Sequence, residues 1–253
     1  MFAKPPPWGR FWFDTLLIMQ AVILAAGRGT RMVELTSAVP KPMLEVAGRP
    51  LLEYKLEALP EEVDEVVLII GYLGHVIRSR FGARYDDKRI SYVEQKAQSG
   101  TADALWSAKN ILKDRFLVLN GDDIYPKEDI ETVIAPGDVW RLLVQQKEDL
   151  GRSGSVELDQ DGHVLAIVEG DHDAEKGIAS TNMFLLDSRL FSQPMTLMRE
   201  GHLEFGLPQT IIAAAKNIGV TIEPVYTTDW IEINTPTDLV HAGNVLKNRA
   251  KKA

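Results

Sequence analysis

The sequence contains no cysteine in its 253 residues. A disulfide framework, a zinc site with thiolate ligands and a thiol nucleophile are therefore excluded. The same absence fits a reducing compartment, and we expect a cytoplasmic protein. No uninterrupted apolar run reaches the ~18 residues that a membrane-spanning helix needs, so no membrane partner is predicted.

Positive charge is also scarce, because 28 lysines and arginines stand against 36 acidic residues and the formal net charge is −8. An acidic chain repels phosphate polymers, so nucleic acid is not an expected partner. Any phosphate that this chain binds must be held by a local group of basic residues. Composition does not decide between a monomer and a homo-oligomer, and both stay open.

The segment before Met19 is interpreted as an extension and not as part of the folded domain. The stretch Phe11–Ala26 is rich in apolar residues, like a signal peptide, but Asp14 and Gln20 interrupt it. Residues 1–18 are therefore expected to be a non-native or disordered extension, and residues 19–253 a single domain.

From Met19 to Asn120, short apolar runs alternate with helical patterns, which predicts an α/β domain with a mainly parallel sheet. From about Val139 several strand patterns follow one another, and we expect antiparallel pairing there. The expected strands are 21–26, 64–70, 90–94, 115–120, 139–146, 154–159, 163–170, 179–187, 220–226 and 229–234. The expected helices are 49–59, 73–81, 101–112, 208–218 and about 236–251.

A glycine-rich loop follows the first expected strand in "AVILAAGRGTRM" (Ala21–Met32), and "PKPM" (Pro40–Met43) comes shortly after it. The loop could be a plain tight turn, or a dinucleotide-binding G-x-G-x-x-G pattern in which methionine replaces the third glycine. A third interpretation is a cradle whose backbone N–H groups surround the phosphates of a nucleoside triphosphate. Arg28, Arg31 and Lys41 crowd the loop of an otherwise acidic chain, and this local charge favours the triphosphate.

"LAAGRGTRM" followed by "KPM" resembles the sugar-1-phosphate nucleotidylyltransferases, and the resemblance extends from Met19 to the C-terminal helix. It implies a Rossmann-like three-layer α/β/α fold with a mainly parallel mixed sheet. It also implies that Arg31 and Lys41 contact phosphates; a plain solvated loop lysine is the alternative for Lys41, although two flanking prolines fix its direction. The loop residues that would surround the triphosphate are Leu24, Ala25, Ala26, Gly27, Gly29 and Thr30.

The segment "EQKAQSGTADAL" (Glu94–Leu105) has a spacing similar to the uracil-reading segment of a bacterial uridylyltransferase of this family. A glutamine amide can donate to a carbonyl and accept from a ring N–H, and a glycine lets backbone groups approach a base edge. These properties favour a pyrimidine. A polar loop leading into a helix is the alternative. The residues expected at the base are Gln95, Gln98, Gly100 and Thr101.

Mg²⁺ is the cofactor that the resemblance implies. "LVLNGDD" places Asp122 directly after a buried strand, at the edge where α/β sheets bind ligands, and its match to the family's G-D makes it the first metal ligand. Asp123 is interpreted as a supporting residue or an ordinary turn residue. The second ligand is expected in "DWIEINTPTDL", where Glu232 takes the place of the family's aspartate. Asn234 is the alternate, and Asp229 is a third choice.

For the sugar phosphate, the resemblance implies a glycine loop, a strand-end glutamate and polar residues on the next strand. Relatives carry a lysine just after that glutamate, whereas this chain has "VEGDHDAEKG", and Lys176 is the lysine that could replace it. A plain surface role for Glu169 stays open. The residues at the matching places are Gly154, Glu169, Ser180, Thr181 and Asn182.

Together these residues predict an enzyme that transfers a nucleotidyl group from a nucleoside triphosphate to a sugar 1-phosphate. UTP is favoured and dTTP is next, and the reaction would be a Mg²⁺-assisted in-line displacement that releases pyrophosphate. The alternative is a non-catalytic regulatory subunit that binds a nucleotide sugar. The missing lysine and the unusual second ligand favour that subunit, whereas Arg31, Lys41 and Asp122 favour the enzyme.

Overall fold

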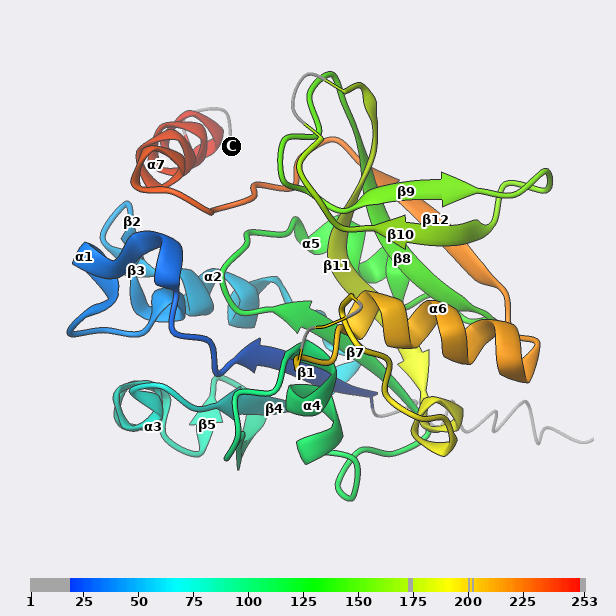
Figure 1. Cartoon of the computed structure of the whole chain (residues 1–253). Helices are drawn as coiled ribbons and strands as arrows, with labels where there is room; N and C mark the ends of the chain where they lie inside the picture. Colours follow the sequence, from blue (N-terminus) through cyan, green and yellow to red (C-terminus); the bar gives the residue numbers. More distant parts are fainter. Residues whose placement is uncertain (1–18, 173–174, 200, 202, 251–253) are drawn as a thin grey trace, which may run out of the picture.

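The computed structural model describes residues 19–172, 175–199, 201 and 203–250 (Figure 1). The expected extension over residues 1–18 lies outside the described residues, as does Lys251 at the end of the last expected helix. Among the helices of the described residues, none has the length and apolar character needed to cross a bilayer.

Ten strands form one sheet: β1 (Met19–Ala25), β4 (Val63–Ile70), β5 (Arg84–Tyr85), β6 (Lys88–Glu94), β7 (Arg115–Asn120), β8 (Trp140–Lys147), β9 (Ser155–Leu158), β10 (Val164–Val168), β11 (Gly177–Asp187) and β12 (Ile222–Thr227). Two short strands, β2 (Glu45–Val46) and β3 (Arg49–Pro50), pair with each other. The helices are α1 (Val33–Thr36), α2 (Leu51–Ala58), α3 (Gly74–Phe81), α4 (Thr101–Ser107), α5 (Lys127–Val133), α6 (Leu207–Ile218) and α7 (Pro236–Ala250), with 3₁₀ turns at Thr30–Met32, Lys41–Met43 and Ser188–Ser192.

The middle of the sheet is parallel, since β1 lies between β7 and β4 and runs parallel to both, and β4 runs parallel to β6. The second half is mixed: β11 runs antiparallel to β7, β8 and β9, while β12 runs parallel to β8. The expected antiparallel pairing after Val139 is therefore confirmed, with β12 as a parallel addition.

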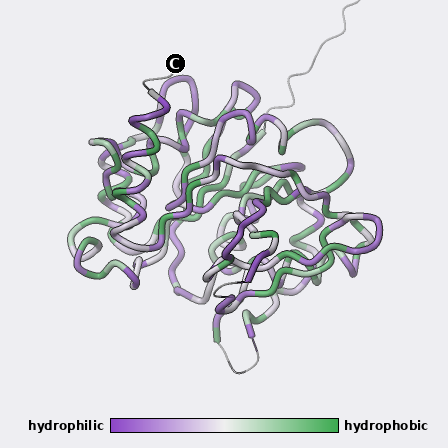
Figure 2. The backbone as a smooth tube through the Cα atoms, turned by 90° about the horizontal axis from the view of Figure 1, so that it is seen from above, coloured by the Kyte–Doolittle hydropathy of each residue, from purple (hydrophilic) through white to green (hydrophobic). Residues whose placement is uncertain are grey.

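Helices cover both faces of the sheet because successive side chains of a strand point to opposite faces. Ala21 and Ile23 of β1 pack in one buried cluster with α2, α3 and α5. Val22 packs in a second cluster with α4 and α6 on the other face. Figure 2 shows hydrophobic residues along the strands that run through the middle of the molecule. Strands covered on both faces are apolar throughout, and this explains the continuous "AVILA" and "VVLII" runs.

Two expectations about local structure were wrong. Asp229–Asn234 is not a regular strand, because Ile231 makes only an isolated antiparallel bridge with Ile124. The helix expected over 101–112 ends at Ser107 and continues as turns. The bridge at Ile231 matters most, since it lays the segment that carries Glu232 beside the segment that carries Asp122.

Candidate active site

A cavity of about 470 Å³ lies at the carboxyl ends of β1, β6 and β7. This is the edge where open α/β sheets bind ligands. The structure brings together at this cavity all the residues predicted for the phosphates and the base, and Asp122 and Asn234 with them. The lining is Leu24, Ala25, Ala26, Gly27, Arg28, Gly29, Thr30, Arg31, Met32, Lys41, Pro42, Gln95, Gln98, Gly100, Thr101, Ala104, Asn120, Gly121, Asp122, Met198, Glu204 and Asn234.

The glycine loop is shaped by close packing against the chain that follows it. Gly29 has a φ of +64°, and a Cβ there would lie 3.0 Å from Thr36 Cγ2 and 3.1 Å from Lys41 Cβ. A glycine is therefore needed for both the backbone angle and the space. Met32, at the place of the third glycine, is buried in a cluster with residues of α2 and α7. The loop thus departs from the dinucleotide pattern because that position anchors it to the core.

Lys41 is a buried site residue and not a solvated loop lysine. Its side chain is 10% exposed, and its Nζ donates to Asp122 Oδ2 at 2.5 Å. Pro40 and Pro42 flank it, and a 3₁₀ turn begins at Lys41 itself. The ammonium therefore lies between the glycine loop and the first predicted metal ligand.

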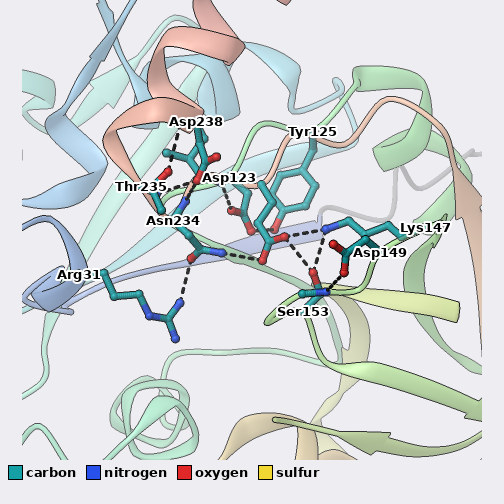
Figure 3. A network of polar contacts seen from close by, with 12 residues as sticks. Arg31, Asp123, Tyr125, Lys147, Asp149, Ser153, Asn234, Thr235 and Asp238 are labelled. Atoms are coloured by element: carbon teal, nitrogen blue, oxygen red, sulfur yellow. Dashed lines mark hydrogen bonds and ion pairs between the residues drawn. The ribbon is translucent and has the colours of Figure 1, made fainter. Parts of the chain in front are cut away.

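The second predicted carboxylate is held from three sides (Figure 3). Glu232 Oε2 accepts from Lys147 Nζ at 2.7 Å and from Ser153 Oγ at 2.9 Å. Glu232 Oε1 accepts from Asn234 Nδ2 at 2.8 Å, and Asn234 Oδ1 accepts from Arg31 Nη1 at 3.0 Å. A continuous chain of contacts thus joins the arginine of the glycine loop to a lysine at the end of β8.

Asp229, the third choice for a metal ligand, lies elsewhere. Its side chain is exposed and pairs with Arg249 of α7, with an Oδ1–Nη2 distance of 2.9 Å. Neither Asp229 nor Glu232 is among the residues that line the cavity, but Glu232 contacts Asn234, which does line it.

Asp123 is a buried carboxyl that ties the two carboxylate-bearing segments together. It is 5% exposed, and it accepts from Ile233 N and from Tyr125 OH, both at 3.3 Å. Burial first, and then the charge of Asp122, raise the pKa of Asp123. Lys55 of α2 is 1% exposed, and burial lowers its pKa, while the charge of Asp123 acts in the opposite direction. The sequence pattern did not indicate this ionisable pair beneath the site.

The base segment forms the opposite wall of the cavity. Gln95 Nε2 donates to Gly100 O at 3.0 Å and to Asp103 Oδ2 at 2.9 Å, so this amide group shapes the turn. Gln98 Nε2 donates to Ala26 O at 3.3 Å, which links the base segment to the glycine loop. Thr101 Oγ1 accepts from the backbone N of α6's first residue at 2.9 Å.

The residues predicted for the sugar lie on β11, just before β9 and just after β10, but they do not line the cavity. Ser180 N donates to Gly154 O at 2.8 Å, and a Cβ on Gly154 would lie 3.8 Å from Glu169 Cγ. Asn182 is half-buried, with a φ of +56°. Thr181 is fully buried, and its hydroxyl donates to Leu143 O at 2.9 Å, so its side chain belongs to the core.

Lys176 does not take the place of a lysine beside Glu169. Its side chain is 61% exposed, and its Nζ pairs with Glu148 Oε1 at 2.6 Å. Glu169 accepts instead from Gln209 Nε2 of α6 at 3.1 Å. Lys147, which the sequence analysis did not single out, reaches the second predicted metal ligand, Glu232.

Residues 20–248 match the nucleotidyl transferase family. The chain belongs to this family. The bifunctional protein GlmU of Methanococcus vannielii is 30% identical over 240 residues, which cover 91% of this chain and 56% of the relative. This chain thus spans about half the length of the bifunctional relatives that it matches. UTP-glucose-1-phosphate uridylyltransferase AglF of Haloferax volcanii is 25% identical over 243 residues, which cover 93% of this chain and 99% of that protein.

A similar solved structure is the UDP-glucose pyrophosphorylase complexed with UDP-glucose, with a TM-score of 0.75 and 18% identity. The match covers 92% of this chain and 99% of that one. At this identity the likeness shows the fold, and the predicted Rossmann-like fold with a mainly parallel mixed sheet is confirmed. The resemblance to sugar-1-phosphate nucleotidylyltransferases is confirmed by the family match and the relatives.

Proposed function

We propose that this chain catalyses the transfer of a nucleotidyl group from a nucleoside triphosphate to a sugar 1-phosphate. The observation that carries this proposal is the gathering of Arg28, Arg31 and Lys41 around one cavity, beside a glycine loop and opposite Asp122. An acidic chain that concentrates three cations at one loop is equipped to hold a polyphosphate there. Membership of the nucleotidyl transferase family supports the same reaction.

The proposed reaction is an in-line displacement at the α-phosphorus. A phosphate oxygen of the sugar 1-phosphate forms a new bond to the α-phosphorus, and the bond from that phosphorus to the bridging oxygen of the leaving group breaks. The electron pair leaves with pyrophosphate. The nucleophile is already ionised near neutral pH, so no general base is required. Lys41 and Arg31 would contact the phosphates and offset the repulsion between two anions, and the loop N–H groups would hold the leaving group.

Asp122 and Glu232 would hold a Mg²⁺ ion. Both offer carboxylate oxygens, which this ion prefers, and they lie on segments that the Ile124–Ile231 bridge holds together. Each carboxylate also contacts an ammonium group, Lys41 at 2.5 Å and Lys147 at 2.7 Å, and these cations would share the carboxylate charge with a bound ion. The donor set therefore fits the ion. When bound, the ion would supply positive charge to the phosphate oxygens.

Within this function we propose UTP as the preferred donor and dTTP as the next. Gln98 and Gly100 line the cavity, and their amide and backbone groups suit the edge of a pyrimidine. For the sugar we propose Gly154, Glu169, Ser180 and Asn182, which the strands β9 to β11 hold close to one another.

The first test is pyrophosphate release with Mg²⁺, in which each common nucleoside triphosphate is combined with glucose-, N-acetylglucosamine-, mannose- and N-acetylmuramate-1-phosphate. Release with one pair, fastest with UTP or dTTP, would support the proposal and name the substrates. No release with any pair, in a protein that still binds a nucleotide by calorimetry, would favour a non-catalytic nucleotide-sugar-binding subunit.

The second test uses Lys41→Ala and Asp122→Ala. Loss of a group that acts on the transition state lowers kcat by about 10²- to 10³-fold, and we expect at least this loss in each variant. Lys127→Ala is the matched control, because Lys127 is exposed and pairs only loosely with Glu131 at 3.7 Å. Thermal unfolding would verify that the variants fold. Near-normal turnover in Lys41→Ala or Asp122→Ala would refute the assignment.

A further inference from the structure

Lys147 is a fixed and partly buried cation at the far end of the contact chain in Figure 3. Its Nζ donates to Glu232 Oε2 at 2.7 Å and to Ser153 Oγ at 2.8 Å, and it lies 4.7 Å from the centre of the Trp230 ring. The side chain is 23% exposed. Holding a long lysine side chain in one place costs rotamer entropy. The three contacts of the Lys147 ammonium offset this cost and keep its charge at one position.

The position of Lys147 suits the second substrate better than the first. Arg28, Arg31 and Lys41 line the cavity at the glycine loop, where the triphosphate is proposed to bind. In-line attack requires the acceptor phosphate to approach from the side opposite the leaving group. Ser153, which contacts Lys147, directly precedes the proposed sugar-binding Gly154. The Lys147 ammonium thus contacts both a proposed metal ligand and the residue next to a proposed sugar-binding glycine.

We propose that Lys147 alternates between two anions: it neutralises Glu232 in the free protein, and it binds the phosphate of the sugar 1-phosphate once a divalent cation is on Glu232. The inference rests on the proposed function. Two positive groups on one carboxylate repel each other, and a partly desolvated ammonium is attracted to a phosphate dianion. Lys147 would thus weaken binding of the divalent cation in the free protein and strengthen binding of the acceptor afterwards.

This proposal predicts two effects of opposite sign from one substitution. Lys147→Met keeps an unbranched side chain on Trp230 but removes the charge. Without the competing ammonium, Mg²⁺ should bind the free protein about threefold or more tightly, because Glu232 loses its internal cation. The KM for the sugar 1-phosphate should rise by about tenfold or more, because a charge-assisted contact is lost, while the KM for the nucleotide changes little.

The matched control is Lys176→Met. Lys176 precedes β11, whose first residue Gly177 pairs with Lys147, but its side chain is exposed and pairs with Glu148. The Lys176→Met substitution removes one positive charge from the same part of the protein, so it controls for a general change of the electrostatic field. Neither the Mg²⁺ affinity nor the acceptor KM should change in this variant. Lys147→Arg keeps the charge, and we expect it to recover part of the acceptor affinity.

Calorimetric titration of Mg²⁺ without substrates gives the first effect, and steady-state kinetics with varied acceptor gives the second. Weaker Mg²⁺ binding in Lys147→Met would overturn the proposal, since it would mean that Lys147 merely supports Glu232. An unchanged acceptor KM would overturn it as well. If Lys147→Met does not fold, Lys147→Gln removes the charge and keeps a hydrogen-bond donor. A wild-type protein without any transfer activity would refute the proposed function alone, because the Mg²⁺ titration still tests the role of Lys147.

Discussion

Gly100 should be the cavity residue that tolerates substitution least. It has a φ of +102°, and a Cβ there would lie 2.6 Å from Phe205 N and still closer to Phe205 O. Those backbone atoms are themselves fixed, because Phe205 N donates to Ser99 O at 2.7 Å and Phe205 O accepts from Ala102 N at 3.0 Å. Gly100→Ala must therefore push the segment before α6 away from the base segment.

The expected cost of Gly100→Ala has two parts. Holding a residue with a Cβ at positive φ costs about 1–2 kcal/mol, and overpacking against atoms that cannot rotate away costs about 1–3 kcal/mol. A total of about 3 kcal/mol would lower the Tm of a chain of this size by about 6–12 °C. Gly162→Ala is the matched control: Gly162 has a φ of +85°, and a Cβ there would contact nothing within 4 Å.

The two variants would be compared by urea unfolding and by the KM for the nucleotide. In both variants the free energy of unfolding should fall because a residue with a Cβ is held at positive φ. Only in Gly100→Ala should it fall further, because the new Cβ overlaps the Phe205 backbone. Because Gly100 lines the cavity, its variant should also raise the nucleotide KM, whereas the Gly162 variant should not. Equal destabilisation of the two variants would refute the reasoning, since it would mean that the Phe205 segment moves away at no cost.

Two further predictions concern a contact in the cavity and a half-buried carboxylate outside it. Gln98→Ala should raise the KM for the nucleotide more than that for the sugar phosphate, because Gln98 lines the cavity and bonds Ala26 O; an unchanged nucleotide KM in steady-state assays would show that the base site is misplaced. Burial raises the pKa of Asp187, but hydrogen bonds from Arg189 and Trp140 outweigh it, and the pKa is lowered overall. The stability that this carboxylate contributes is therefore present above its unfolded pKa of about 4 and is lost as the pH falls through the folded value. Asp187→Asn should be less stable than the wild type near pH 7 and should approach it at low pH in urea titrations; a gap that does not change with pH would contradict this.

Much of the fold could be predicted because its signals are local. The apolar runs of β1, β4 and β7 are continuous, since helices cover both faces of these strands, and the helical patterns between them alternate in order. The short strand β5 and the helix α5 were not predicted, because both are brief and carry weak periodicity. The Asp229–Asn234 segment has strand-like alternation, yet only Ile231 finds a partner. Whether a segment with strand-like alternation joins a sheet depends on a free strand edge, and residues far along the chain supply that edge.

The residues predicted for the phosphates and the base come from a different kind of signal. A glycine loop is easily recognised in a sequence, because its positive φ angles and its close contacts with neighbouring atoms admit few residues other than glycine. Gly29 and Gly100 are examples. The sugar residues have no such signal, since a position on a strand does not say which face a side chain takes. Thr181 follows Ser180 by one residue, and that single step turns its hydroxyl into the core.

Lys147 and Lys55 were missed because nothing in their own neighbourhoods marks them, and for Asp123 the sequence left a supporting role and an ordinary turn role open. Each becomes informative only through a partner far along the chain: Lys147 through Glu232, and Asp123 through Ile233. Lys55 lies in an ordinary amphipathic helix, where a lysine usually indicates the solvated face. Burial reverses that expectation, and burial is a property of the assembled fold.

Glu232 and Asn234 were weighed as rival metal ligands, but the structure makes them partners. Asn234 donates its amide hydrogen to Glu232 Oε1 and accepts from Arg31 with its own oxygen. Residues two apart in an extended segment project to the same side, so counting along the sequence could not separate their roles. A carboxylate carries a negative charge and has more acceptor sites than an amide oxygen, so Glu232 stays the ligand that we propose. The amide then has a different use, because it fixes that carboxylate relative to the arginine proposed to contact the triphosphate.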